Sequence, residues 1–167
     1  MRRSAVDDVV GALERAPAMV IPLARQAPSE TRRRRPPSNK WSIHEHVVHL
    51  ADVDALMARR LDVMLSAADP VIRSYDPGRD DPADRLLQID FEDALARYAR
   101  DRTELVARLR RLTVAQWRRT AHHEEYNSYS VFTMFRHLSL HDFFHAYRIE
   151  ELILRRDWPV PLDLLLE

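Results

Sequence analysis

The chain of 167 residues has no cysteine and only two glycines, Gly11 and Gly78. Because cysteine is absent, disulfides, a thiolate nucleophile in the protein, iron–sulfur clusters and cysteine-ligated zinc are excluded. Loops that bind phosphate with backbone amides need several positions without a Cβ atom, so two glycines exclude both the P-loop and the dinucleotide-binding loop. Any sulfur chemistry would therefore depend on a thiol that the protein binds.

The sequence also lacks an excess of charge of either sign and a long apolar run. Lys+Arg and Asp+Glu each number 26, so the formal net charge is zero, whereas a nucleic-acid surface usually has a basic excess. No apolar run approaches the roughly 20 residues that span a bilayer. Asp7 and Asp8 lie where a secretory signal would have its apolar core. We therefore expect a cytoplasmic protein without a nucleic-acid or membrane partner.

The composition is that of a globular protein, with 46% hydrophobic and 31% charged residues, and the length favours a single domain over residues 1–167. Apolar residues recur at helical spacing, and no strand of alternating polarity is evident. The expected long helices are residues 4–26 (interrupted at Pro17), 41–66, 84–112 and 130–156. We therefore predict an all-α, antiparallel four-helix bundle with an irregular central loop at residues 67–82, rich in Asp and Pro.

Three helix starts have a capping pattern. Ser4, with Asp7 three residues on, places the start of the first helix. Ser42 and Glu45 have the spacing at which each side chain binds the free backbone N–H of the other, which places the start of the second helix. Thr113 and Gln116 have the same spacing and predict a short capped turn that holds Trp117.

The neutral total conceals two segments of opposite charge. Residues 1–40 contain nine basic and four acidic side chains, a net charge of +5, and residues 69–93 contain eight acidic and three basic ones, a net charge of −5. Two interpretations are open: two separately solvated segments, or a self-complementary contact between two copies of the chain.

Most of the eight histidines fall in two predicted helices. His137, His141 and His145 have i, i+4, i+8 spacing and so share one stripe of the last helix. Neutral imidazole is a common ligand of zinc and nickel, and an i, i+4 pair can bind one ion from a single helix. A third histidine on a facing helix would complete the three-ligand arrangement of catalytic zinc sites. Spacing alone leaves open whether 137/141 or 141/145 is the chelating pair.

The second helix supplies three candidates for the third ligand. His49 shares a stripe with Leu50 and Val53, whereas His44 lies near the exposed capping turn and His46 nearer the polar side. His49 is therefore the favoured ligand. A ferritin-like carboxylate site would need two Glu-x-x-His motifs, and the sequence has none.

Two motifs resemble those of the DinB/YfiT-like superfamily. Residues 40–52, KWSIHEHVVHLAD, resemble the W-S-x-x-E-x-x-x-H-L-x-D opening of that family's second helix. Residues 141–149, HDFFHAYRI, resemble its closing H-D-x-x-H segment. Residues 117–119, 122–123 and 129–131 fall where the family has comparable features, so the likeness covers nearly the whole chain as one DinB-like domain.

The resemblance implies a four-helix bundle, a homodimer and a divalent ion, zinc or nickel, held by His49, His141 and His145. His137 would then have a packing role. Characterised relatives include S-transferases that use low-molecular-weight thiols such as mycothiol or bacillithiol. The first functional hypothesis is therefore a metal-dependent transferase that joins a small thiol to a small electrophilic substrate.

Further site residues follow from position around these ligands. Asp52, one turn from His49, is a candidate catalytic residue that would orient a ligand or bound water, with a solvated carboxylate as the alternative. Arg59, Arg60 and Arg148 are candidates for binding an anionic substrate, and a surface role is the alternative for each.

Two other functions stay open: a hydrolase that uses metal-bound water, and a non-enzymatic, stress-related metal-binding protein. An enzyme should have a cavity beside the three histidines, lined by residues 67–82 and 117–129. A purely structural metal site should instead be closed by a fourth ligand, for which His44, His122 and His123 are the candidates.

Overall fold

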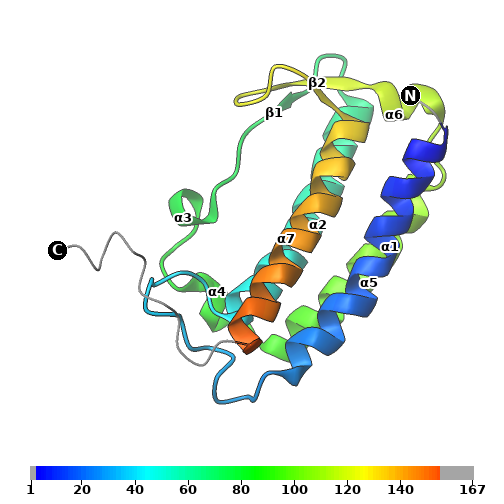
Figure 1. Cartoon of the computed structure of the whole chain (residues 1–167). Coiled ribbons are helices and arrows are strands. Elements are labelled where there is room, and N and C mark those ends of the chain that lie inside the picture. Colours follow the sequence, from blue (N-terminus) through cyan, green and yellow to red (C-terminus); the bar gives the residue numbers. More distant parts are fainter. Residues whose placement is uncertain (1–2, 155–167) are drawn as a thin grey trace, which may run out of the picture.

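Four long helices lie side by side in the computed structural model, which describes residues 3–154 (Figure 1). They are α1 (Arg3–Gln26), α2 (Ile43–Ser66), α5 (Phe91–Leu109) and α7 (Val131–Leu154). In Figure 1, α1 and α7 run in one direction and α2 and α5 in the other. Contacts join α1 to α5 and α7, and α2 to the same two helices. The predicted all-α four-helix bundle is confirmed, with α1/α5 and α2/α7 as its antiparallel neighbours.

Short elements fill the connections between the long helices. The segment between α2 and α5 contains β1 (Val71–Ile72), α3 (Pro77–Asp80) and α4 (Arg85–Gln88). The segment between α5 and α7 contains α6 (Val114–Arg118), β2 (Thr120–His123) and β3 (Tyr129–Ser130). Strand β1 pairs in parallel with β2, and β2 pairs antiparallel with β3. No alternating pattern indicated these strands, because strands of two to four residues are too short to show alternation in the sequence.

Two predicted helix boundaries need correction. Helix α1 continues without a break through Pro17 and Pro22, because its buried face, which includes Leu13 and Val20, packs on both sides of Pro17. The predicted helix 84–112 is divided into α4 and α5, because the Asp90 side chain accepts a hydrogen bond from the backbone of Asp93 and so caps a new helix. The expected end at Arg156 lies outside the described residues.

The capping boxes predicted at Ser42 and Thr113 are confirmed, whereas the cap predicted at Ser4 is wrong, because α1 already includes Arg3 and Ser4 lies inside the helix. The Ser42 hydroxyl accepts from the Glu45 backbone N–H, and the Glu45 carboxylate accepts from the Ser42 backbone N–H at 2.8 Å. Thr113 and Gln116 do the same at α6, and Trp117 is buried. Among the described residues, no helix is both long and apolar enough to cross a membrane.

The two segments of opposite charge meet within one chain. The Arg25 guanidinium lies 2.7 Å from the Glu92 carboxylate, and that of Arg35 lies 2.6 Å from Asp84. The contact therefore joins the last turn of α1 and the α1–α2 connection to the starts of α5 and α4. The charge pattern is thus explained without a second copy of the chain.

A buried ion network joins all four long helices. Arg102 of α5 is 1% exposed and donates to the carboxylates of Asp54 in α2 and Asp142 in α7. Its third contact is the backbone oxygen of Leu13 in α1, 3.1 Å away. Burial raises the pKa of both carboxyl groups, and the guanidinium opposes that rise. A single buried cation therefore joins the four long helices at the centre of the bundle.

Replacing Arg102 with methionine should lower the free energy of unfolding by about 3–5 kcal/mol, because two buried carboxylates lose their cation. Urea unfolding followed by far-UV circular dichroism measures the change. Arg100→Met on the same helix is the control, because the Arg100 side chain is 61% exposed and its change should stay within about 0.5 kcal/mol. Equal losses in the two variants would contradict a central role for the network.

Candidate metal centre

The antiparallel contact between α2 and α7 brings three of the predicted histidines together. The Nε2 atom of His141 lies 3.0 Å from the Nε2 atoms of both His49 and His145. These three residues, the histidine triad, can each place a ring nitrogen within 4.8 Å of the other two. His137 lies outside this group and is exposed. The geometry thus selects the 141/145 pair that spacing left open, while the role of the triad as ligands stays a prediction.

Burial keeps the triad in the protonation state that metal binding needs. It lowers the pKa of His49 to about 3 and that of His141 to about 4, and it lowers the pKa of His145 further. Neighbouring histidines lower each of these pKa values further. For His49 and His145 the neighbour is His141, because a positive charge on its ring would disfavour a second charge beside it. The imidazoles are therefore neutral near pH 7, with lone pairs available.

The donor set fits a divalent ion. Three neutral imidazoles, with no cysteine in the chain, are the ligands that zinc and nickel accept. The Nδ1 atoms of His49 and His141 are buried and have no hydrogen-bond partner among the described residues. The Nε2 atoms face one another instead, as the ligand atoms of a single ion would. The triad can thus hold a divalent metal.

Trp41 covers the triad on one side. Its ring centroid lies 4.7 Å from that of His49 and 6.0 Å from that of His145, and it is nearly parallel to the His145 ring. The capping box at Ser42 fixes the backbone next to Trp41 and so places the indole. In the sequence this tryptophan was part of a motif without a predicted role. The structure makes it a wall that shields the imidazoles.

A cavity of about 420 Å³ opens beside the triad, and we call it the histidine cavity. Apolar residues of α2 and α7 line part of it, and Arg60 is the arginine among its lining residues. The remaining wall comes from two connections and consists of residues 74–77, His123, Glu125, Tyr126 and Tyr129. Both connections were expected at the mouth of an enzyme site, and this expectation is confirmed.

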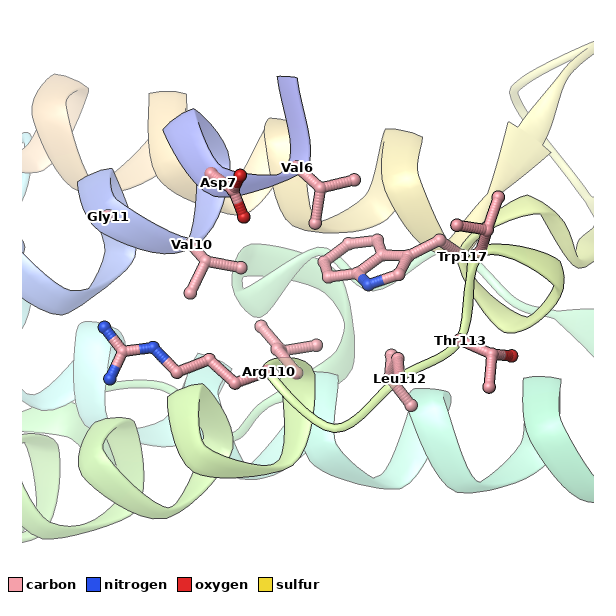
Figure 2. Close-up of a pocket in the computed structure, with 10 residues that line it drawn as sticks. Val6, Asp7, Val10, Gly11, Arg110, Leu112, Thr113 and Trp117 are labelled. Atoms are coloured by element: carbon pink, nitrogen blue, oxygen red, sulfur yellow. The ribbon is translucent and has the colours of Figure 1, made fainter. Parts of the chain in front are cut away.

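A second cavity, of about 390 Å³, lies between the first turns of α1 and the connection from α5 to α6 (Figure 2). Figure 2 shows the Trp117 indole facing Val6 and Val10, with Asp7 and Arg110 at the edge. No histidine lines this cavity. It lacks the converging donor atoms of the triad, so the histidine cavity is the better candidate for chemistry.

Three predicted site residues lie elsewhere and need correction. Asp52 binds Arg85 and Arg97 through its two carboxylate oxygens and does not line the histidine cavity. Its carboxylate is instead held by the arginines that the α4 and α5 segments bring to it. Arg59 is exposed, and Arg148 forms an ion pair with Glu151; neither lines the cavity.

The other histidines of α2 are buried, contrary to the prediction. The Nε2 atom of His44 lies 2.8 Å from the backbone oxygen of Ile89, and the Nδ1 atom of His46 lies 2.7 Å from that of His145. Packing of the α4–α5 junction and of α7 against the start of α2 covers both rings. Neither residue joins the triad, nor do His122, which pairs with Asp69, and His123. Within residues 3–154 the group therefore has three donors and no fourth.

Comparison with known proteins agrees with this fold. The model of the DinB superfamily matches residues 12–149, and the chain belongs to that superfamily. Among solved structures, it is similar to YfiT from Bacillus subtilis, with a TM-score of 0.80 and 24% sequence identity. The match covers 91% of this chain and 87% of YfiT, which is described as a probable metal-dependent hydrolase with an unusual four-helix bundle topology. No curated protein matches the chain. The likeness to YfiT shows the common fold.

Bound zinc should resist acid. Protons compete with a metal for an ordinary histidine below its pKa of about 6.5. Because the pKa values of His49 and His141 are lowered to about 3 and about 4, that competition begins at a lower pH. Zinc affinity should therefore change little down to about pH 5 and fall steeply only near pH 4. Titrations with a competing chelator at several pH values measure this. A loss of zinc centred near the ordinary histidine pKa would contradict it.

Proposed function

We propose that this chain is a divalent-metal-dependent enzyme that uses the histidine triad to activate a low-molecular-weight thiol for transfer to an electrophilic substrate. One observation carries the proposal: three imidazoles, two buried and that of His141 half-buried, border an open cavity of about 420 Å³, and no carboxylate is grouped with them among the described residues. A catalytic three-histidine site keeps a position for an exchangeable ligand, whereas a structural site is closed by a fourth.

The residues around the triad would each have a separate role in such a site. A divalent ion bound there would act as a Lewis acid and lower the pKa of a coordinated thiol or water. The Trp41 ring and the apolar side chains of Met57 and Leu138 keep bulk water from the imidazoles. Arg60, which donates to the backbone oxygen of Arg73, supports the binding of an anionic group of the substrate at the cavity wall. In the transfer, the thiol loses its proton to solvent and its sulfur forms a bond to a carbon of the electrophile, while the bond from that carbon to its leaving group breaks and the leaving group departs with the electron pair.

The donor set favours a thiol over water as the nucleophile. A coordinated thiol is deprotonated outright, so its activation needs no protein base. Hydrolysis by water is helped by a general base within hydrogen-bond reach, commonly a carboxylate or histidine. The triad has no carboxylate in its group, and Asp52 is bound to two arginines. The chain has no cysteine, so the sulfur must come from a bound molecule.

A hydrolase is the second candidate, and the description of YfiT as a probable metal-dependent hydrolase favours it. In that case, a titratable side chain of the cavity wall, such as Glu125 or His137, would have to supply the base. A non-enzymatic metal-binding protein is the third. The open cavity beside the triad favours the two enzymatic functions over this one.

The purified protein should contain about one divalent ion per chain. His141→Ala removes the histidine that lies next to both other members of the triad, so this variant should lose the ion. His137→Ala is the matched control, since it removes the histidine one turn away that lies outside the triad, and it should retain the ion. Elemental analysis gives the metal content. A metal-free wild type, tested also after incubation with zinc and nickel, would refute the proposed function.

The metal-loaded protein should consume free thiol when mycothiol or bacillithiol is mixed with a reactive electrophile, and His141→Ala should fall to the uncatalysed rate. Loss of free thiol and formation of the thioether give independent readouts. Cleavage of simple esters or amides by the same preparation, without thiol consumption, would replace the transferase by the hydrolase. If neither reaction depends on the metal, the non-enzymatic function is supported.

We also propose that the chain forms a homodimer through α7. Four large side chains at i, i+3, i+4 and i+7, each 47–63% exposed, form one face of this helix: Leu140, Phe143, Phe144 and Tyr147. Exposed apolar patches mark interaction sites, and a two-fold axis lets one helix face pack against its own copy. Phe143→Glu should shift the sedimentation coefficient from dimer to monomer, while Met19→Glu on α1 should not. A monomeric wild type would overturn the proposal.

A further inference from the structure

A fourth histidine, His46, contacts the triad on the side away from the converging Nε2 atoms. The Nδ1 atom of His46 lies 2.7 Å from the Nδ1 atom of His145, on the side of the ring opposite to the Nε2 atom that faces His141. The two residues are 5% and 4% exposed, and their rings meet edge to face with centroids 4.9 Å apart. His46 is therefore in direct contact with one proposed ligand and outside the group of three donors.

The chemistry of imidazole determines what this contact requires. A neutral imidazole has one N–H and one nitrogen lone pair, so a short distance between two ring nitrogens needs a proton on one of them and a lone pair on the other. If the Nε2 atom of His145 gives its lone pair to a metal, the proton of this neutral ring is on Nδ1. The Nδ1 atom of His46 must then accept that proton, and the N–H of His46 is on Nε2.

The contact distinguishes His145 from the other two members of the triad. The Nδ1 atoms of His49 and His141 are buried without a partner among the described residues. Histidine ligands in proteins almost always donate their second ring N–H to an acceptor that fixes the tautomer and the ring orientation. Trp41 packs against both rings of the pair, with centroids 5.6 Å from His46 and 6.0 Å from His145, and so limits the access of competing water.

We propose that His46 is a positioning residue, which accepts a hydrogen bond from the Nδ1–H of His145 and so holds the Nε2 atom of that ring ready for a divalent ion. The proposal rests on the proposed function of the triad as a metal centre. It assigns a role to a residue that the sequence pattern placed nearer the polar side of its helix. No local pattern indicates this role, because the contact joins residues 99 positions apart.

Three variants separate an acceptor role from simple packing. His46→Phe fills the space but removes the acceptor, and its zinc affinity should be about 10–100-fold weaker than that of the wild type. His46→Asn places an amide oxygen near the position of Nδ1, and its affinity should recover to within about threefold of the wild type. His44→Phe is the matched control, since His44 is equally buried on α2 but binds the backbone of Ile89. Its zinc affinity should not change.

Zinc affinities are measured by competition with a chromophoric chelator, with thermal unfolding as a check that each variant folds. If the wild type binds no zinc, the proposed function itself fails. If the wild type binds zinc and His46→Phe binds it equally well, only the role of His46 is overturned. That role is also overturned if His46→Asn is as weak as His46→Phe, or if His44→Phe loses as much affinity, because packing would then explain the loss.

A measurement on the wild type does not depend on whether a variant folds. Long-range ¹H–¹⁵N spectra of the zinc-loaded protein distinguish protonated from unprotonated ring nitrogens. We expect a proton on Nδ1 of His145 and on Nε2 of His46, with Nδ1 of His46 unprotonated. A proton on Nδ1 of His46 would overturn the proposal, because that nitrogen could then accept no hydrogen bond from His145.

Discussion

The buried guanidinium of Arg102 sets the relative position of the four long helices. It binds Asp54 of α2, Asp142 of α7 and the backbone of Leu13 in α1 from its own place in α5. A buried charge is tolerated only when its partners are in place, so a shift of any helix along its axis would leave an ion without a counter-ion. The network therefore specifies the register of the bundle, at a cost in desolvation that an apolar core would not have.

The histidine triad depends on that register. Asp142 directly follows His141, and Asp54 is five residues beyond His49, so the carboxylates that bind Arg102 are anchored close to the histidines along the same two helices. Holding α2 and α7 through these carboxylates places the Nε2 atom of His49 at 3.0 Å from that of His141. The same segment of α7 therefore contributes to two polar clusters: Asp142 belongs to the ion network on one face of the helix, and His141 and His145 belong to the triad on another. A third face of α7 is exposed and apolar.

A site built in this way differs from one that rests on loops. The triad lies entirely on long helices, whose backbones are held by packing and by the ion network, whereas the cavity wall comes from the connections at residues 74–77 and 123–129. The chemistry that the imidazoles can perform is therefore fixed by the bundle. The substrate contacts are supplied by segments that can vary without disturbing the triad. The His46–His145 contact belongs to the rigid part, which is why a role in positioning is expected of it.

Much of the fold was predictable because local signals are strong. Helical spacing of apolar residues indicated the long helices, and the two capping boxes indicated the starts of α2 and α6. Prediction failed where tertiary contacts decide: the continuation of α1 through Pro17, the division at Asp90, and the short strands. For the site, i, i+4 spacing and the shared stripe identified the histidines that the structure brings together. The same reasoning misplaced Asp52, because a position one turn from His49 says nothing of the arginines that α4 and α5 bring to it.

The sequence by itself determined the chemical inventory: no thiol in the protein, histidines at helical intervals, and an all-α bundle in which facing helices could bring them together. Only the tertiary structure decided which of these groups meet. It brought together His141 and His145, the pair that spacing left open and that the family resemblance implied, buried His46 against His145, and engaged Asp52 and Asp142 with arginines. The physical reason is that spacing along a helix fixes the direction of a side chain relative to its own axis. What lies in that direction depends on the rotation and register of the neighbouring helices, which long-range packing and the buried ion network set.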